Sequence, residues 1–102
     1  MKTIHKYSIP GPELSDVITF DMPTDAKVLS VGNQRECLCI WAEVETDTID
    51  PKNKAKPMMS VRLFRVAGTG HPLEVGLPLG RFIGTVMFAN GSLVFHIYEG
   101  ET

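Results

Sequence analysis

Hydrophobic and polar residues alternate along most of this chain, in short runs that end at glycine, proline or polar residues. The clearest runs cover residues 3–9, 17–22, 27–31, 36–44 and 58–66, and two more flank Asn90-Gly91. Alternation with a period of two is typical of strands that bury one face. No stretch of a dozen residues shows the 3.6-residue period of an amphipathic helix. The pattern therefore predicts an all-β protein of about seven strands.

Turn signals every ~8–12 residues are typical of a small antiparallel sandwich or barrel. The pattern places one hairpin loop at residues 32–35 and long loops after the fourth and fifth strands. The first long loop, residues 45–57, is polar and is expected to be exposed. The second continues to Gly80 and has four expected buried anchors: Leu73, Val75, Leu77 and Leu79. A chain of 102 residues without a repeat is expected to form one domain, residues 1–102.

The last quarter of the chain gives the most definite expectation. Asn90-Gly91 suits a two-residue type I′ turn, because both residues tolerate positive φ angles. That turn would place Phe88 opposite Leu93 and Thr85 opposite His96. One face would be wholly apolar and point to the core: Phe82, Val86, Phe88, Leu93, Phe95 and Ile97. Gly84 on that face is expected to permit a bulge or a close neighbouring backbone.

The opposite face of this hairpin is mixed, and it carries Ile83, Thr85, Met87, Ala89, Ser92, Val94, His96 and Tyr98. It is too apolar for plain solvent exposure. We expect it to pack on a second subunit, to line a ligand cleft or to lie under the long loops. In the fourth run a similar division places four apolar residues on one face, namely Leu38, Ile40, Ala42 and Val44.

The charge balance limits the classes of partner. Ten Lys and Arg against twelve Asp and Glu give a formal net charge of −2. Binding to duplex nucleic acid usually leaves a basic excess, which this chain lacks. No apolar run approaches the ~20 residues that cross a bilayer, and the N-terminus has no secretory h-region. We therefore expect a cytoplasmic protein that binds neither membranes nor duplex nucleic acid.

The two cysteines agree with a reducing compartment. Cys37 and Cys39 lie two apart in one predicted strand, a spacing that disfavours a disulfide between them. They are expected to be small buried hydrophobes. A metal or redox role would need a histidine nearby, and zinc sites usually show a tighter paired spacing. No cofactor is expected.

A glycine-rich segment is the first candidate ligand site. Gly68, Thr69, Gly70 and His71 follow a predicted strand, and successive glycines let backbone N–H groups converge on an anion. The segment lacks the lysine of a P-loop and the third glycine of a dinucleotide fingerprint. An ordinary turn is the alternative interpretation.

Other candidates lie on the strands. Arg62 and Arg65, on opposite faces of one strand, are suited to phosphate, although pairing with Glu43, Asp21 or Glu99 is the alternative. Trp41 and Tyr98 offer stacking surfaces, with core packing as the alternative for Trp41. Thr85 and His96 form a cross-strand polar pair that would orient a ligand or simply satisfy a half-buried imidazole. No nucleophile motif, carboxylate pair or His/Asp cluster indicates an enzyme.

Several segments together resemble a known family. They are residues 1–9 (MKTIHKYSI), 28–31 (VLSV), 39–42 (CIWA), 65–72 (RVAGTGHP), 82–85 (FIGT) and 93–99 (LVFHIYE). This combination is similar to a family of small proteins encoded by bacteriophages and prophages. The resemblance covers nearly the whole chain and brings no established activity with it.

The resemblance implies a phage accessory protein that acts in the cytoplasm of the host cell, with counter-defence as the expected role. We expect a non-enzymatic homo-oligomer that sequesters a small anionic ligand, such as a nucleotide immune signal. A protein–protein inhibitor of a host factor is the main alternative, and a minor structural phage protein is another.

Overall fold

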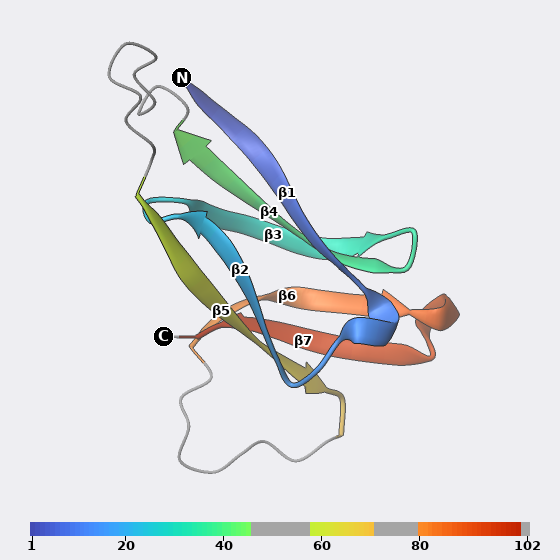
Figure 1. The fold of residues 1–102 in the computed structure, drawn as a ribbon. Helices are drawn as coiled ribbons and strands as arrows, with labels where there is room; N and C mark the ends of the chain where they lie inside the picture. Colours follow the sequence, from blue (N-terminus) through green and yellow to red (C-terminus); the bar gives the residue numbers. More distant parts are fainter. Residues whose placement is uncertain (46–57, 71–79, 101–102) are drawn as a thin grey trace.

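The computed structural model describes residues 1–45, 58–70 and 80–100. Within these ranges the chain forms seven antiparallel strands in two sheets, with two short 3-10 helices (Figure 1). Most of the two predicted long loops lies outside the described residues. The same holds for His71 and for the expected anchors Leu73, Val75, Leu77 and Leu79.

The strands follow the order of the alternating runs. They are β1 (Lys2–Pro10), β2 (Val17–Pro23), β3 (Lys27–Gln34), β4 (Cys37–Glu45), β5 (Met59–Gly68), β6 (Arg81–Phe88) and β7 (Leu93–Glu99). The 3-10 helices are η1 (Gly11–Glu13) and η2 (Ala89–Gly91). One sheet has the order β1-β4-β3, and the other has the order β2-β5-β7-β6. The predicted all-β class is confirmed, and the described strands form a sandwich that does not close into a barrel.

The core lies between the inward faces of the two sheets. From β4 it receives Leu38, Ile40, Ala42 and Val44, all at most 2% exposed, so the predicted division of this strand is confirmed. The four-stranded sheet contributes Phe64 and Ile97, both fully buried, among others. Each large apolar side chain buried in this way stabilises the fold by about 1.5–3 kcal/mol.

The predicted register of the terminal hairpin is confirmed over most of its length. The pairs run from Phe88 opposite Leu93 to Gly84 opposite Ile97. The turn has φ angles of 57° at Asn90 and 88° at Gly91, as a type I′ turn requires. It is closed by the Ser92 N–H, which donates to the Ala89 carbonyl at 3.1 Å.

A β-bulge between Phe82 and Gly84 then overturns two predicted positions. Tyr98 pairs with Phe82 instead of Ile83, so Phe82 lies outside and is 52% exposed, whereas Ile83 packs against the core. A Cβ atom at Gly84 would lie only 2.9 Å from Cγ1 of Val31 on the other sheet. The expected bulge at this glycine is therefore confirmed, and its close neighbour is a side chain where backbone was the other expectation.

Leu93 departs from the predicted core face in a different way. It has the predicted orientation but is 51% exposed, because it lies next to the turn and borders an open cavity at the end of the sandwich.

The β3–β4 turn also lies later than predicted. β3 continues to Gln34, and the turn consists of Arg35 and Glu36, with φ angles of 54° and 60°. The side chain of Asn33 stabilises this turn, because its Oδ1 accepts the Glu36 N–H at 2.8 Å. The Glu36 carboxylate in turn accepts the backbone N–H of Ala89 at 3.1 Å. The two hairpin turns at this end of the molecule are thereby joined.

The sheets approach each other along β3 and β6, where side chains bridge the two strands. At one end Nδ2 of Asn33 donates to the Met87 carbonyl at 2.8 Å. At the other end Nη2 of Arg81 donates to the Val28 carbonyl at 3.2 Å. Edge strands carry unpaired backbone groups, and these bonds satisfy some of them.

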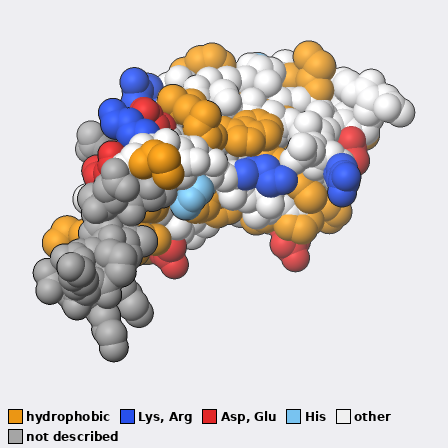
Figure 2. Space-filling model, turned by 90° about the horizontal axis from the view of Figure 1, so that it is seen from above, with side chains coloured by type: hydrophobic (Ala, Val, Ile, Leu, Met, Phe, Trp, Pro, Cys, Tyr) orange, Lys and Arg blue, Asp and Glu red, His pale blue; other side chains and the backbone are white. Residues whose placement is uncertain are grey.

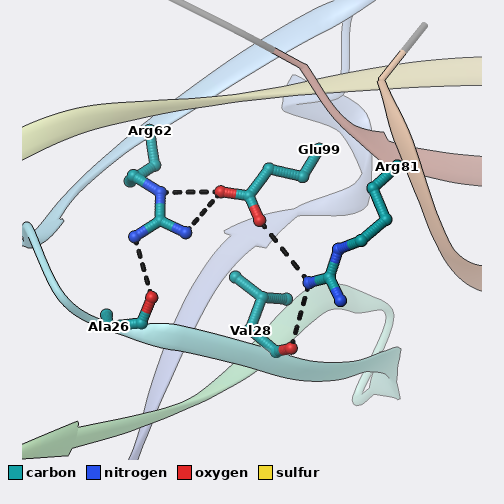
Figure 3. A network of polar contacts seen from close by, with 5 residues as sticks. All are labelled: Ala26, Val28, Arg62, Arg81 and Glu99. Atoms are coloured by element: carbon teal, nitrogen blue, oxygen red, sulfur yellow. Dashed lines mark hydrogen bonds and ion pairs between the residues drawn. The ribbon is translucent and has the colours of Figure 1, made fainter.

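The Arg81 end belongs to a larger ion-pair network (Figure 3). Glu99 accepts from Nε of Arg62 at 2.6 Å and lies 3.7 Å from Nη2 of Arg81. Nη1 of Arg62 also donates to the Ala26 carbonyl at 2.9 Å, beside the start of β3. The side chains of Arg62 and Glu99 are only 20% and 14% exposed. One carboxylate thus holds two arginines that both reach across to the opposite sheet.

Removing the charge at Glu99 tests this network. Glu99→Gln keeps the size of the side chain but leaves Arg62 half-buried without a counter-charge. We expect a loss of about 1–3 kcal/mol in the free energy of unfolding, measured in urea. The control Glu43→Gln removes a partly exposed carboxylate 3.9 Å from the exposed Lys2 ammonium group and should cost less than about 1 kcal/mol. Equal losses in both variants would contradict this assignment.

Replacing each of two glycines with nearly the same φ by alanine provides a second test, which compares the space around each glycine. Gly80 (φ 90°) and Gly91 (φ 88°) differ in surroundings: a Cβ at Gly80 would lie 2.0 Å from the Glu99 carbonyl oxygen, whereas Gly91 has open space. We expect Gly91→Ala to cost about 1–2 kcal/mol from backbone strain alone. Gly80→Ala should cost more, because the β6 backbone must also move away from Glu99. Thermal unfolding of both variants measures the difference, and a smaller loss at Gly80 would refute it.

Candidate functional site

Five of the ten predicted site residues lie together on one surface, the outer face. This is the side of the four-stranded sheet that points away from the three-stranded sheet. Strand alternation places them there, because Phe64, Val66 and Ile97 are buried on the inner side. The five residues come from β5, its following turn, β6 and β7: Arg65, Thr69, Thr85, His96 and Tyr98.

His96 is held between two threonines. Its Nδ1 lies 2.9 Å from the Thr85 hydroxyl, which confirms the predicted cross-strand pair. Its Nε2 lies 2.7 Å from the Thr69 hydroxyl. A neutral imidazole has one donor and one acceptor, so one threonine accepts from the ring while the other donates to it. The accepting threonine keeps its hydroxyl hydrogen for another partner.

The contact with Thr69 was not predicted, because it depends on how β5 pairs with β7. Ala67 lies opposite His96, and the Thr69 N–H donates to the Val94 carbonyl at 3.1 Å. These contacts bring the glycine-rich segment next to the histidine. Only the long-range register of the sheet reveals this.

Arg65 lies beside this group, with Val17 on one side and Tyr98 on the other. Its Nε atom is buried and has no hydrogen-bond partner, and it is the only such side-chain atom found within the described ranges. None of the carboxylates described forms an ion pair with Arg65. A buried donor without a partner is costly, and its presence calls for an explanation.

Exposed apolar side chains lie on the same face as these polar groups. The large ones on the outer face are Val17, Met59, Val61, Phe82 and Met87, of which Met87 is 58% exposed. Phe82 and Tyr98 pack edge to face with their ring centroids 5.3 Å apart. Figure 2 shows the molecule from above, after a 90° turn from the view of Figure 1. On this side hydrophobic, basic and acidic side chains are mixed.

Four other predicted residues are described and do not join this site, whereas His71 lies outside the described residues. Arg62 points to the inner side and pairs with Glu99, one of its expected alternatives. Trp41 lies on β4 of the other sheet and covers Gly32, where a Cβ atom would lie 3.2 Å from its ring. Gly70 forms a turn with φ of 80°. The nine predicted residues that the structure describes therefore do not form a single pocket.

Gly68 is also separated from the outer face. It is the last residue of β5 and borders the open cavity at the end of the sandwich, whereas the next residue, Thr69, bonds to His96.

Cys39 is buried as expected, whereas Cys37 is only partly buried. Both are free thiols, and Cys39 is 1% exposed, with its Sγ 3.6 Å from the Cys37 carbonyl oxygen. Among the residues that the structure describes, no three His, Cys, Asp or Glu side chains are grouped closely enough to hold a metal ion.

Arg62 has a further neighbour at the open margin between β1 and β2. Tyr7 packs against Phe20 with ring centroids 6.0 Å apart, and Phe20 packs against Phe64. Burial raises the pKa of the Tyr7 phenol above its ordinary value of 10.0, and the positive charge of Arg62 partly opposes this shift. The protonated phenol is the form that suits the fold.

Comparison with known proteins yields one match. A family described as a domain of unknown function (DUF7352) matches residues 1–102. No curated protein and no solved structure shows significant similarity to the chain. Across the residues described, no helix has the length and apolar character needed to cross a membrane.

The environment of Tyr7 predicts a pH dependence of stability. Because its folded pKa is raised, its contribution is complete below pH 10.0 and is lost as the pH rises through the folded pKa. In Tyr7→Phe this component disappears, so its stability should fall less steeply with pH in alkaline solution. Urea unfolding of both proteins on either side of pH 10 measures the two slopes. Identical slopes would contradict the assignment.

Proposed function

The chain belongs to the DUF7352 family, and we propose that it is a non-enzymatic binding protein that sequesters a small anionic ligand on its outer face. The observation that carries this proposal is the buried, unbonded Nε of Arg65. A phosphate or carboxylate oxygen is the acceptor that would satisfy this donor. The apolar neighbours Val17 and Tyr98 strengthen such a contact, because they keep water away from it.

The surroundings of Arg65 suit a ligand that combines an anion with an aromatic ring. One threonine beside His96 retains a hydroxyl hydrogen to donate to phosphate. The exposed ring of Phe82 provides a stacking surface. Nucleotides carry both groups. The sequence resemblance to phage proteins extends the proposal to a nucleotide immune signal, bound in the cytoplasm of a host cell as a counter-defence.

A sheet face by itself covers only one side of a ligand. We therefore propose that the protein works as a homo-oligomer in which a second copy covers the outer face. The exposed apolar side chains on the outer face support this arrangement, because their burial would contribute to association.

The same apolar side chains also support a second candidate function. Five large apolar side chains exposed on one sheet are typical of a protein–protein interface. In this alternative the outer face binds and inhibits a host protein, and Arg65 pairs with an acidic group of that partner.

A thermal-shift screen with linear and cyclic nucleotides tests the first proposal. We expect a melting temperature that rises with nucleotide concentration, as mass action requires. Arg65→Gln should weaken binding by about 10–100-fold, because it removes a charged hydrogen bond. The unliganded variant should be as stable as the wild type or more stable, since the unbonded donor is gone. The control Lys27→Gln, on the other sheet, should bind normally.

The same variants separate the two candidates. Lack of stabilisation by every nucleotide, at concentrations well above micromolar, would overturn the ligand proposal. Recovery of one partner from host lysate at stoichiometric yield, abolished in Phe82→Ser, would then favour the inhibitor. A marked loss of stability in unliganded Arg65→Gln would show that Arg65 is structural, and it would refute both functions of this residue.

A further inference from the structure

A second candidate site lies at the end of the sandwich, away from the outer face. Here η1 lies beside the β6–β7 turn and the end of β5 (Figure 1). These elements border a cavity of about 440 Å³ that is open to solvent, which we call the end pocket. Its lining includes Leu14, Asp16, Val66, Phe88, Leu93 and Phe95. The volume lies in the range of ligand sites, ~300–1,000 Å³.

The walls of the end pocket are apolar and ordered by packing. Phe88 and Phe95 meet edge to face with ring centroids 6.0 Å apart. Phe88 and Val66 belong to the core, and Leu14 packs against it. Half-exposed Leu93 lies at the rim. An aromatic or aliphatic group entering here would replace water against these side chains.

Backbone hydrogen bonds hold the rim in place. The Gly11 N–H donates to the Glu36 carbonyl at 2.9 Å, and the Val66 N–H donates to the Asp16 carbonyl at 2.9 Å. These bonds connect η1 and the segment after it to both sheets. The pocket is therefore part of the folded framework.

The charged groups described in the lining are both acidic, Asp16 and Glu36. The Glu36 carboxylate already accepts from Asn33 and from the backbone of Ala89. The Asp16 carboxylate makes no hydrogen bond or ion pair with any residue in the described ranges. An apolar pocket with one available carboxylate at its edge suits a ligand with an apolar body and a positive end.

We propose that the end pocket binds a small amphipathic cation, with its aromatic or aliphatic body against Phe88 and Phe95 and its ammonium group at Asp16. This site is distinct from the outer face, because its lining comes from the inner side and the turns. The ligand proposed for the end pocket is a cation, whereas the ligand proposed for the outer face is an anion. A free amine and the side chain of a peptide would share this chemistry.

Three matched probes test the proposal on the full chain by two-dimensional amide NMR: 2-phenylethylamine, 2-phenylethanol and 3-phenylpropionate. We expect the ammonium probe to shift the amide signals of Leu14, Gly68 and Phe95, with weaker binding of the alcohol and the weakest binding of the carboxylate. Asp16→Asn should lower the affinity for the amine about two- to fivefold and leave that for the alcohol unchanged. The control Asp21→Asn, on β2, should change neither.

The outcomes separate clearly. No shift of these signals by millimolar amine or alcohol would overturn the pocket as a site. Equal affinity for the amine and the carboxylate, or no effect of Asp16→Asn, would overturn the charge preference. A lysine-containing aromatic peptide that binds more tightly than the free amine would identify a peptide as the ligand source. Since Arg65 lies elsewhere, Arg65→Gln should bind the amine normally whatever it does to nucleotides.

Discussion

The contact between Glu99 and the two arginines is the constraint on which the arrangement of the sheets depends. β5, β6 and β7 each supply one member, and the two guanidinium groups continue to carbonyl oxygens near the start of β3. The opposite end of the β3–β6 seam is joined through Asn33 and Glu36. With both ends fixed, the hydrophobic core can determine the stability of the sandwich without also having to determine its alignment.

This alignment separates two surfaces with different chemistry. The outer face carries an arginine among apolar side chains, whereas the end pocket carries an acid at the edge of an apolar cavity. They meet where β5 ends and its following turn begins, because Gly68 borders the pocket and Thr69 bonds to His96. A displacement of this short segment would therefore change the geometry of both surfaces.

The local sequence pattern was sufficient to predict the strands and much of the register of the terminal hairpin. Alternation located the strands, and Asn90-Gly91 located the last turn, because both signals come from neighbouring residues. The sequence marked Gly84 as a place for a bulge, but it did not show that the extra residue is Ile83, which accompanies the approach of Val31 from the other sheet. The contact between Thr69 and His96 and the unbonded Nε of Arg65 likewise depend on strand pairs far apart in sequence. The sequence placed Arg62 and Arg65 on opposite faces of one strand but did not show which of them is paired. The fold pairs Arg62 with Glu99, whereas no carboxylate in the described part of the chain pairs with Arg65.

The two long sides of the sandwich are not equivalent. Along one side β3 and β6 are bridged at both ends, whereas along the other β1 and β2 follow each other through η1, with the rings of Tyr7 and Phe20 between them. The β3–β6 side is therefore fixed by polar bridges at both ends, whereas the β1–β2 side is held by the packing of two aromatic rings. Native-state fluctuations should begin with the separation of β1 from β2, and the amide protons of β3 and β6 should be the last to exchange with solvent.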